Sequence, residues 1–178
     1  MLIEPQTARL QLRQWREEDR EPFAAMNADP AVMEFFPSTL TRVESDAGID
    51  RQIAHINKYG FGFWAVETRA DRRFIGFVGI KTVSEHMPFA PAVEIGWRLA
   101  ADAWGKGYAT EAARASLRVG FEELGLEEIV SFTVPGNFRS RAVMEKLGMT
   151  QGENFLHPGL SGGHPMQEHV LYRLKNSR

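Results

Sequence analysis

One segment in the second half of the chain constrains the fold more than any other, and it reads EIGWRLAADAWGKGYATEAA. It begins as a strand that ends near Leu99 and leads into an apolar stripe that predicts a helix from Thr110 to Leu124. Gly105 and Gly107 stand in the turn between them, where glycine lets the backbone turn and lets another group approach. Because the first amides of a helix have no partner within it, this loop suits a pyrophosphate, and Lys106 adds a positive charge.

The glycine spacing excludes two common nucleotide motifs. A P-loop has four residues between its glycines and then Gly-Lys-Ser/Thr, which Gly105-Lys106-Gly107 does not match. A Rossmann fingerprint needs Gly or Ala where Thr110 stands, and it lies in the first strand–helix unit rather than beyond mid-chain. Taken alone, the loop also fits an ordinary strand-to-helix turn.

The remaining pattern alternates strands with helices. The predicted strands cover residues 9–15, 63–68, 74–83, 93–99, 129–134, 150–155 and 167–174, and the predicted helices cover residues 17–27, 45–59, 110–124 and 140–147. Apolar residues on both faces of residues 74–80 indicate a central strand. This order predicts an α/β (α+β) fold, with helices on both faces of a central mixed sheet, and a single domain over residues 1–178.

Composition excludes several classes of function. The chain has 0 Cys, which removes disulfides, thiolate metal sites and a Cys acyl-enzyme. Its 21 Lys plus Arg nearly balance 23 Asp plus Glu, so no global positive field attracts nucleic acid or an anionic membrane. The N-terminal residues lack the apolar core of a signal peptide, which favours a cytoplasmic protein. His157, His164 and His169 fit no zinc spacing, so we expect no metal.

A second informative segment is NFRSRAVMEKLGM, residues 137–149. Asn137 follows a strand-breaking Pro-Gly pair and is a good helix N-cap, with Ser140 in the first turn. Two interpretations remain open: an ordinary cap, or a pair of polar side chains that face a ligand between this helix and the preceding strand. Arg139, Arg141 and Lys146 make this end basic, which by itself is typical of a solvated face.

Together, four ordered segments resemble the GNAT superfamily of N-acetyltransferases, and its RimJ/RimL-like subgroup most closely. They are TARLQLR at residues 7–13, EIGW at 94–97, GKGYATEA at 105–112, and the segment 137–149. The resemblance covers nearly the whole chain. It implies a mostly antiparallel seven-stranded sheet, splayed between the fourth and fifth strands. Two positions depart from the family: Trp104 stands where Gln or Arg is usual, and Met144 stands where many relatives have a Tyr general acid.

The resemblance implies acetyl-CoA as the donor and no metal. Pantetheine would follow the fourth strand, where a bulge near residues 97–99 would free amides that polarise the thioester carbonyl. The diphosphate would bind to the amides of residues 105–110. The implied cofactor contacts are Trp97, Arg98, Leu99, Trp104, Gly105, Lys106, Gly107, Tyr108, Ala109, Thr110, Asn137 and Arg141.

The implied reaction is direct attack by a primary amine, which must first lose a proton. Glu94 is the candidate base, directly or through water, and Ser140 is the candidate to assist the leaving thiolate; each also fits a purely structural role. Phe36 and Trp64 are the candidate substrate-binding residues of the acceptor cleft, although aromatic residues are more often core. A mild acidic bias in that region comes from Glu34, Glu44, Asp46 and Asp50.

Several alternatives remain at this point. The acceptor would be a protein N-terminus, an antibiotic amine, a polyamine or an amino-acid analogue. A catalytically silent acyl-CoA-binding or sensory module on the same fold is the main competitor, because the Tyr is absent and Trp104 is atypical. A nucleotide-binding protein that does not use CoA is a third. The strand at residues 167–174 alternates as an exposed edge, which would allow a homodimer.

Overall fold

A mixed sheet runs through the molecule in the order β1-β2-β3-β4-β5-β8-β6, and β7 pairs with β8 off this path. The computed structural model describes residues 1–177. Its strands are β1 (Leu10–Arg13), β2 (Phe63–Thr68), β3 (Phe74–Thr82), β4 (Val93–Leu99), β5 (Glu128–Thr133), β6 (Thr150–Gln151), β7 (Phe155–Leu156) and β8 (Glu168–Lys175). Only β4 and β5 pair in parallel; the other neighbours are antiparallel, which confirms the predicted sheet type.

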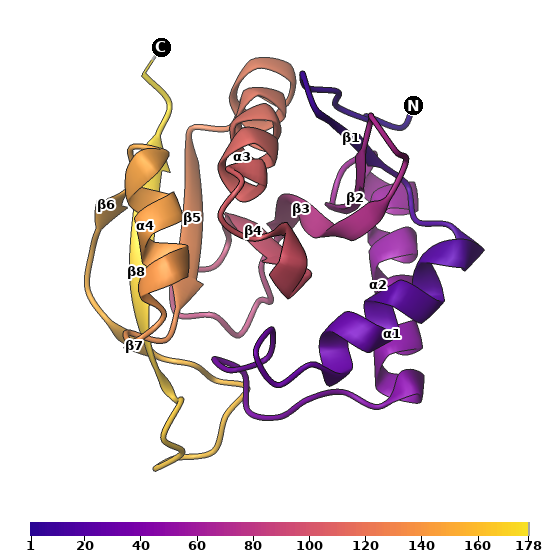
Figure 1. The fold of residues 1–178 in the computed structure, drawn as a ribbon. Helices are drawn as coiled ribbons and strands as arrows, with labels where there is room; N and C mark the ends of the chain where they lie inside the picture. The colour runs from indigo at the N-terminus through magenta and orange to yellow at the C-terminus, as the bar shows by residue number, and fades with distance from the viewer. Residues whose placement is uncertain (178) are drawn as a thin grey trace.

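Helices cover both faces of this sheet (Figure 1). They are α1 (Arg20–Ala28), α2 (Arg42–Tyr59), α3 (Tyr108–Arg118) and α4 (Phe138–Lys146). The ring of Phe23 in α1 lies 6.1 Å from that of Phe77, whereas a Cβ on Gly120, just after α3, would come within 3.3 Å of Ile80. Phe77 and Ile80 point to opposite faces of β3, so α1 and α3 lie on opposite sides. Within residues 1–177, no helix has the length and apolar character required to cross a membrane.

Local chemistry explains where the helices begin and end. The predicted helix at residues 45–59 begins earlier, at Arg42, because Thr41 and Glu44 form a capping box. The predicted helix at 110–124 begins at Tyr108 and changes after Arg118 into a π-helical turn, Val119–Glu123. The last predicted helix begins at Phe138, directly after the Asn137 cap.

The sheet divides between β4 and β5. These strands pair at one position, Glu94 opposite Val130, and then diverge (Figure 1). On its other side β4 pairs with β3 without a break, from Val93 opposite Thr82 to Leu99 opposite Gly76. The bulge predicted near residues 97–99 is therefore wrong, and the predicted splay is present without it.

Two strand predictions near the C-terminus are also wrong. The predicted strand at residues 150–155 is interrupted at Gly152, so β6 and β7 pair separately with β8. Within residues 1–177 the sheet therefore has eight strands rather than seven. The predicted edge strand at 167–174 is internal, because β8 pairs with β5 on one side and with β6 and β7 on the other. Val170, Leu171 and Tyr172 are buried, so this strand offers no free edge for a homodimer.

A line of small residues lets an aromatic ring lie across the central strands. Phe63 of β2 is opposite Gly79 of β3, which is opposite Gly96 of β4. A Cβ on Gly79 would lie 2.0 Å from the carbonyl oxygen of Gly62, and a Cβ on Gly96 would lie 2.9 Å from the Phe63 ring. The absence of these two Cβ atoms therefore sets the spacing of the strands that carry the site described below.

We expect Gly79→Ala to destabilise the protein by about 3 kcal/mol, because a methyl group would overlap backbone that cannot rotate away. The measurement is the urea midpoint of unfolding, which should fall at unchanged slope. Gly162→Ala is the matched control, because nothing lies within 4 Å of its added Cβ. A Gly79→Ala midpoint equal to that of the control would contradict this account.

Candidate active site

A cavity of about 450 Å³ opens where β4 and β5 separate. Its walls come from β4, β5, α4, the connection between α1 and α2, and the segment before β8. Nine of the predicted site residues line it: Phe36, Glu94, Trp97, Arg98, Leu99, Trp104, Ala109, Asn137 and Ser140. The structure thus brings together side chains that are distant in the sequence, including both predicted catalytic residues.

The loop before α3 presents a row of free amides next to this cavity. In the part of the chain that the structure describes, the backbone N–H groups of residues 105–110 have no hydrogen-bond partner. Gly105 and Gly107 have φ angles of 74° and 79°, in the left-handed region that glycine adopts without strain. Gly107 is also the N-cap of α3, so the helix dipole reinforces the amides and the loop can hold an anion.

Arg9 holds this loop in place, and the sequence patterns did not identify it. Its Nε donates to Glu111 Oε2 at 2.7 Å, its Nη1 donates to the Lys106 carbonyl oxygen at 2.8 Å, and its guanidinium lies 4.6 Å from the Tyr108 ring centre. Burial raises the pKa of Glu111, but hydrogen bonds from Thr7 and Arg9 outweigh it and leave that pKa lowered. Glu111 is therefore a structural carboxylate that positions the loop.

The backbone of β4 alternates between its two neighbours. Ser131 of β5 donates its hydroxyl to the carbonyl oxygen of Ile95 at 2.9 Å, so the odd-numbered residues of β4 direct their backbone groups toward β5. β5 pairs with β4 only at Glu94, so the N–H of Trp97 faces the cavity without a strand partner. The carbonyl oxygen of Leu99 on the same edge accepts a hydrogen bond from Trp104 Nε1 at 3.0 Å.

Side chains of β4 reach the cavity from opposite faces of the sheet. On the α4 side, Trp97 Nε1 donates to the Ser140 hydroxyl at 3.3 Å. On the α1 side lie Glu94 and Arg98, and Arg98 Nη1 donates to Asn27 Oδ1 at 2.9 Å. The cavity therefore passes through the plane of the sheet at the point where the two strands separate.

Glu94 has the electrostatic character of a group that exchanges a proton near neutral pH. Burial raises its pKa to about 7, although the positive charge of Lys81, opposite it on β3, partly offsets this rise. A carboxylate with this pKa is largely ionised at slightly alkaline pH and is still basic enough to accept a proton from an amine.

Other predicted residues have structural partners. Asn137 Oδ1 accepts from the Ser140 amide at 3.3 Å and its Nδ2 donates to Thr133 Oγ1 at 3.0 Å, so the N-cap interpretation is met although Asn137 also lines the cavity. Arg141 lies outside the cavity lining, because its donors bind the Tyr172 hydroxyl, the Pro135 carbonyl oxygen and Gln151 Oε1. Arg141 is therefore not placed to contact a ligand in the cavity.

The acceptor side differs from the prediction in two respects. Trp64 does not line the cavity: it is 0% exposed and packs in the core. Phe36 does line the cavity, as predicted: its side chain is 38% exposed and its ring lies 4.3 Å from the Arg98 guanidinium. The four acidic residues proposed for this region also lie outside the lining, which gives the cavity a different charge from the one expected.

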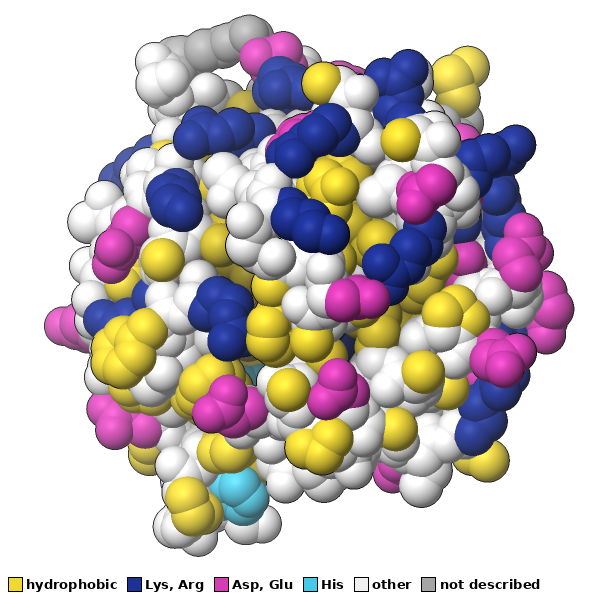
Figure 2. Space-filling model, viewed as in Figure 1, with side chains coloured by type: hydrophobic (Ala, Val, Ile, Leu, Met, Phe, Trp, Pro, Cys, Tyr) yellow, Lys and Arg dark blue, Asp and Glu magenta, His cyan; other side chains and the backbone are white. Residues whose placement is uncertain are grey.

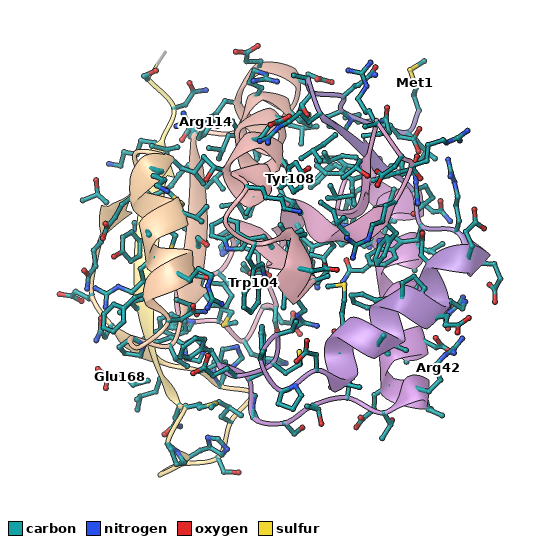
Figure 3. All side chains as sticks on the ribbon, in the orientation of Figure 1. Met1, Arg42, Trp104, Tyr108, Arg114 and Glu168 are labelled. Carbon is teal, nitrogen blue, oxygen red and sulfur yellow. The ribbon has the colours of Figure 1, made fainter. Side chains whose placement is uncertain are left out.

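Trp104 forms part of the wall between α4 and the loop before α3 (Figure 3). The guanidinium of Arg139 stacks on its ring at 3.8 Å, and both side chains line the cavity. Figure 2 shows Lys and Arg side chains gathered over α3 on the same face. The basic residues at this end of α4 are typical of a solvated surface, and only the approach of Arg139 to Trp104 in space marks it as a cavity residue.

Two histidines line the far end of the cavity. The rings of His157 and His169 are 4.9 Å apart and lie beside Phe132, and burial lowers the pKa of both. They are therefore largely neutral at pH 7. Within residues 1–177, no group of three or more His, Cys, Asp and Glu side chains is arranged to hold a metal ion.

Comparison with known proteins identifies the architecture. Residues 9–150 match the model of the acetyltransferase (GNAT) domain. The FsC-acetyl coenzyme A-N(2)-transacetylase of Aspergillus fumigatus is 34% identical over 171 residues, which cover 88% of this chain and 72% of that protein. A Bacillus subtilis protein named uncharacterized N-acetyltransferase YnaD is 30% identical over 169 residues, with 94% of each chain covered. A GNAT-family acetyltransferase structure from Bacillus anthracis superimposes with a TM-score of 0.83 over 99% of this chain and 100% of that one, at 24% identity.

The family model covers most of the chain and includes both β4 and the amide-lined loop. A relative above 30% identity spans most of both sequences. The chain therefore belongs to the GNAT acetyltransferase family.

Proposed function

We propose that this enzyme transfers the acetyl group of acetyl-CoA to a primary amine by direct attack. One observation carries the proposal: the unpartnered N–H of Trp97 and the side chain of Glu94 meet in a single cavity, at the gap between β4 and β5. An acyl transfer to an amine needs an oxyanion donor and a base, and these two groups supply them. The N-acetyltransferase names of the relatives support the same reaction.

The residues present fit acetyl-CoA. Its diphosphate requires several donors that are not used within the protein, and the amides of residues 105–110 meet that requirement. The cavity connects this loop, through Trp104 and Ala109, to the free edge of β4. When bound, acetyl-CoA would supply the activated acetyl group. The name of the Aspergillus relative includes acetyl coenzyme A, which supports this donor.

In the proposed mechanism, Glu94 accepts the proton that the amine must lose, directly or through a water molecule. The Trp97 amide would donate a hydrogen bond to the carbonyl oxygen as negative charge develops there. The Ser140 hydroxyl, oriented by Trp97 Nε1, would donate to the leaving thiolate in place of the absent Tyr. Met144 is buried in the cavity wall and offers no proton.

A catalytically silent acyl-CoA-binding module is not favoured. A binding module needs the loop amides but has no use for a carboxylate whose pKa burial raises to about 7 beside the free edge of β4. The RimJ/RimL-like assignment, the cytoplasmic location and a homodimer stay predictions.

Acetyl-CoA should raise the melting temperature of the purified protein, whereas ATP and NADH should not. At 100 times its dissociation constant, a ligand adds about 2.7 kcal/mol of stability. We expect Ala109→Pro to weaken acetyl-CoA binding roughly tenfold. The substitution removes one of the free amides of residues 105–110, in the first turn of α3, where proline is tolerated. No shift with millimolar acetyl-CoA in the unmodified protein would exclude the donor.

The pH dependence of kcat/KM should show the ionisation of the Glu94 carboxyl group. Its raised pKa means that the base is protonated and inactive below about pH 7 and active above it, so kcat/KM should rise through that pH. Glu94→Gln should abolish the rise of kcat/KM near pH 7 and lower kcat/KM at pH 8 by about 10²-fold or more. The increase that remains at higher pH would come from deprotonation of the amine.

The thermal shift with acetyl-CoA is the control for Glu94→Gln, because the substitution leaves the loop amides in place. A variant with the normal shift but less than a threefold loss of rate at pH 8 would show that Glu94 is a structural carboxylate.

Ser140→Ala should lower kcat by roughly 10²-fold with little change in KM for acetyl-CoA, because the lost hydrogen bond forms only as the thiolate leaves. Trp97→Phe is the matched variant: it removes the indole N–H that binds Ser140 but keeps the hydroxyl and the backbone amide. Because Trp97→Phe keeps the hydroxyl, its loss in kcat should be smaller than that of Ser140→Ala. A loss of less than threefold in kcat for Ser140→Ala would contradict a role for Ser140 in assisting the leaving group.

A further inference from the structure

Arg98 is a half-buried cation, and it has no acidic partner among the residues that the structure describes. It forms one hydrogen bond, from Nη1 to Asn27 Oδ1, and its guanidinium lies 4.3 Å from the Phe36 ring and 5.3 Å from the Phe77 ring. Its Nε is buried without any hydrogen-bond partner, and Nη2 has none among the residues the structure describes. Burial lowers the pKa of Arg98 to about 10, so it remains charged at neutral pH.

Arg13, which is fully buried, shows what a structural role requires. Arg13 forms a paired interaction with both oxygens of Asp19, at 2.8 and 2.9 Å, and its Nε donates to Glu67 at 3.0 Å. Burying a guanidinium without such partners is costly, because its donors are removed from water and not satisfied. Arg98 bears part of that cost at its buried Nε, on the wall of the cavity, where a ligand can supply a missing acceptor.

The acceptor side of the cavity has a defined charge pattern. Among residues 1–177, Glu94 is the only carboxylate in the lining, and Arg98 and Arg139 are its cations. Arg139 is stacked on Trp104, toward the loop before α3. Arg98 shares with Glu94 the face of β4 that α1 covers, four residues along the strand. Phe63 and Phe77, stacked at 5.1 Å, form an apolar floor beside them.

We propose that the acceptor of this enzyme is a small amine that also carries a carboxylate, held by Arg98 while the amine lies beside Glu94. The inference rests on the proposed acetyl transfer and narrows its substrate class. An Arg–carboxylate contact is charge-assisted and directional, and the apolar floor fits the carbon chain that joins the two groups. Polyamines and polycationic antibiotics are disfavoured, because they would place a second positive charge against Arg98.

The test compares pairs of linear amines that differ only at the far end: 4-aminobutanoate with 4-aminobutanamide, and 6-aminohexanoate with 6-aminohexanamide. The intervening carbons keep the basicity of the two amines similar. We expect the unmodified enzyme to favour the acid of the better-fitting length by at least tenfold in kcat/KM, measured as CoA release. Arg98→Met, similar in volume but uncharged, should bring the acid-to-amide ratio to about one, and Arg98→Lys should restore part of it.

A binding measurement without turnover separates this inference from the proposed function. With CoA present, the acid should raise the melting temperature of the unmodified protein more than the amide does, and Arg98→Met should abolish that difference. Acetylation of acids and amides at equal rates would overturn the carboxylate inference and leave acetyl transfer standing. Binding of acids through Arg98 without any CoA release would overturn the proposed function instead. If the acids neither bind nor cause CoA release, both the carboxylate inference and the proposed function are overturned.

Discussion

The functional site depends on the separation of β4 from β5 after a single paired position. A parallel pair that continued would use the backbone groups of both strands and close the sheet. Here Glu94 opposite Val130 is the only pairing, so the Trp97 amide is left free while β3 still holds β4 straight along its other edge. The cavity, the free amide and the passage from one face of the sheet to the other all follow from this separation.

This geometry lets two ligands approach one backbone position from opposite faces. The loop before α3 and the Trp97–Ser140 contact lie on the α3/α4 side, whereas Glu94 and Arg98 lie on the α1 side. Side chains of adjacent strand residues point to opposite faces, so one short stretch of β4 supplies both sides. The polar groups that would bind donor and acceptor can therefore be separate, although the reacting atoms would meet at the same point.

Local patterns predicted the parts of the site that lie within one segment. The glycines of the loop, the Asn137 cap and the apolar faces of β3 follow from short-range chemistry. Contacts between distant segments could not be found this way: Arg9 reaches the Lys106 carbonyl from the first strand, and Arg139 meets Trp104 only in space. The prediction that Trp64 lies in the acceptor cleft is wrong because alternation along a strand does not reveal which face opens to a cavity. The edge prediction for residues 167–174 is wrong because alternation within one strand does not show which strands pair with it, and β6 and β7, of two residues each, cover its second edge.

Unpartnered polar groups indicate function only where a cavity reaches them. The indole N–H of Trp64 is buried without a partner, yet it lies in the core and nothing in the structure explains it. The Trp97 amide and the Arg98 guanidinium instead lie on the wall of one cavity, and the amides of residues 105–110 lie beside it. The buried Nε of Arg98 costs free energy in the ligand-free protein, because a donor removed from water is not satisfied elsewhere, whereas Gly105, Lys106 and Gly107 leave their amides open to solvent. Ligands that supply a diphosphate, a polarised carbonyl and a carboxylate would satisfy these donors, so binding and stability should be coupled at all three.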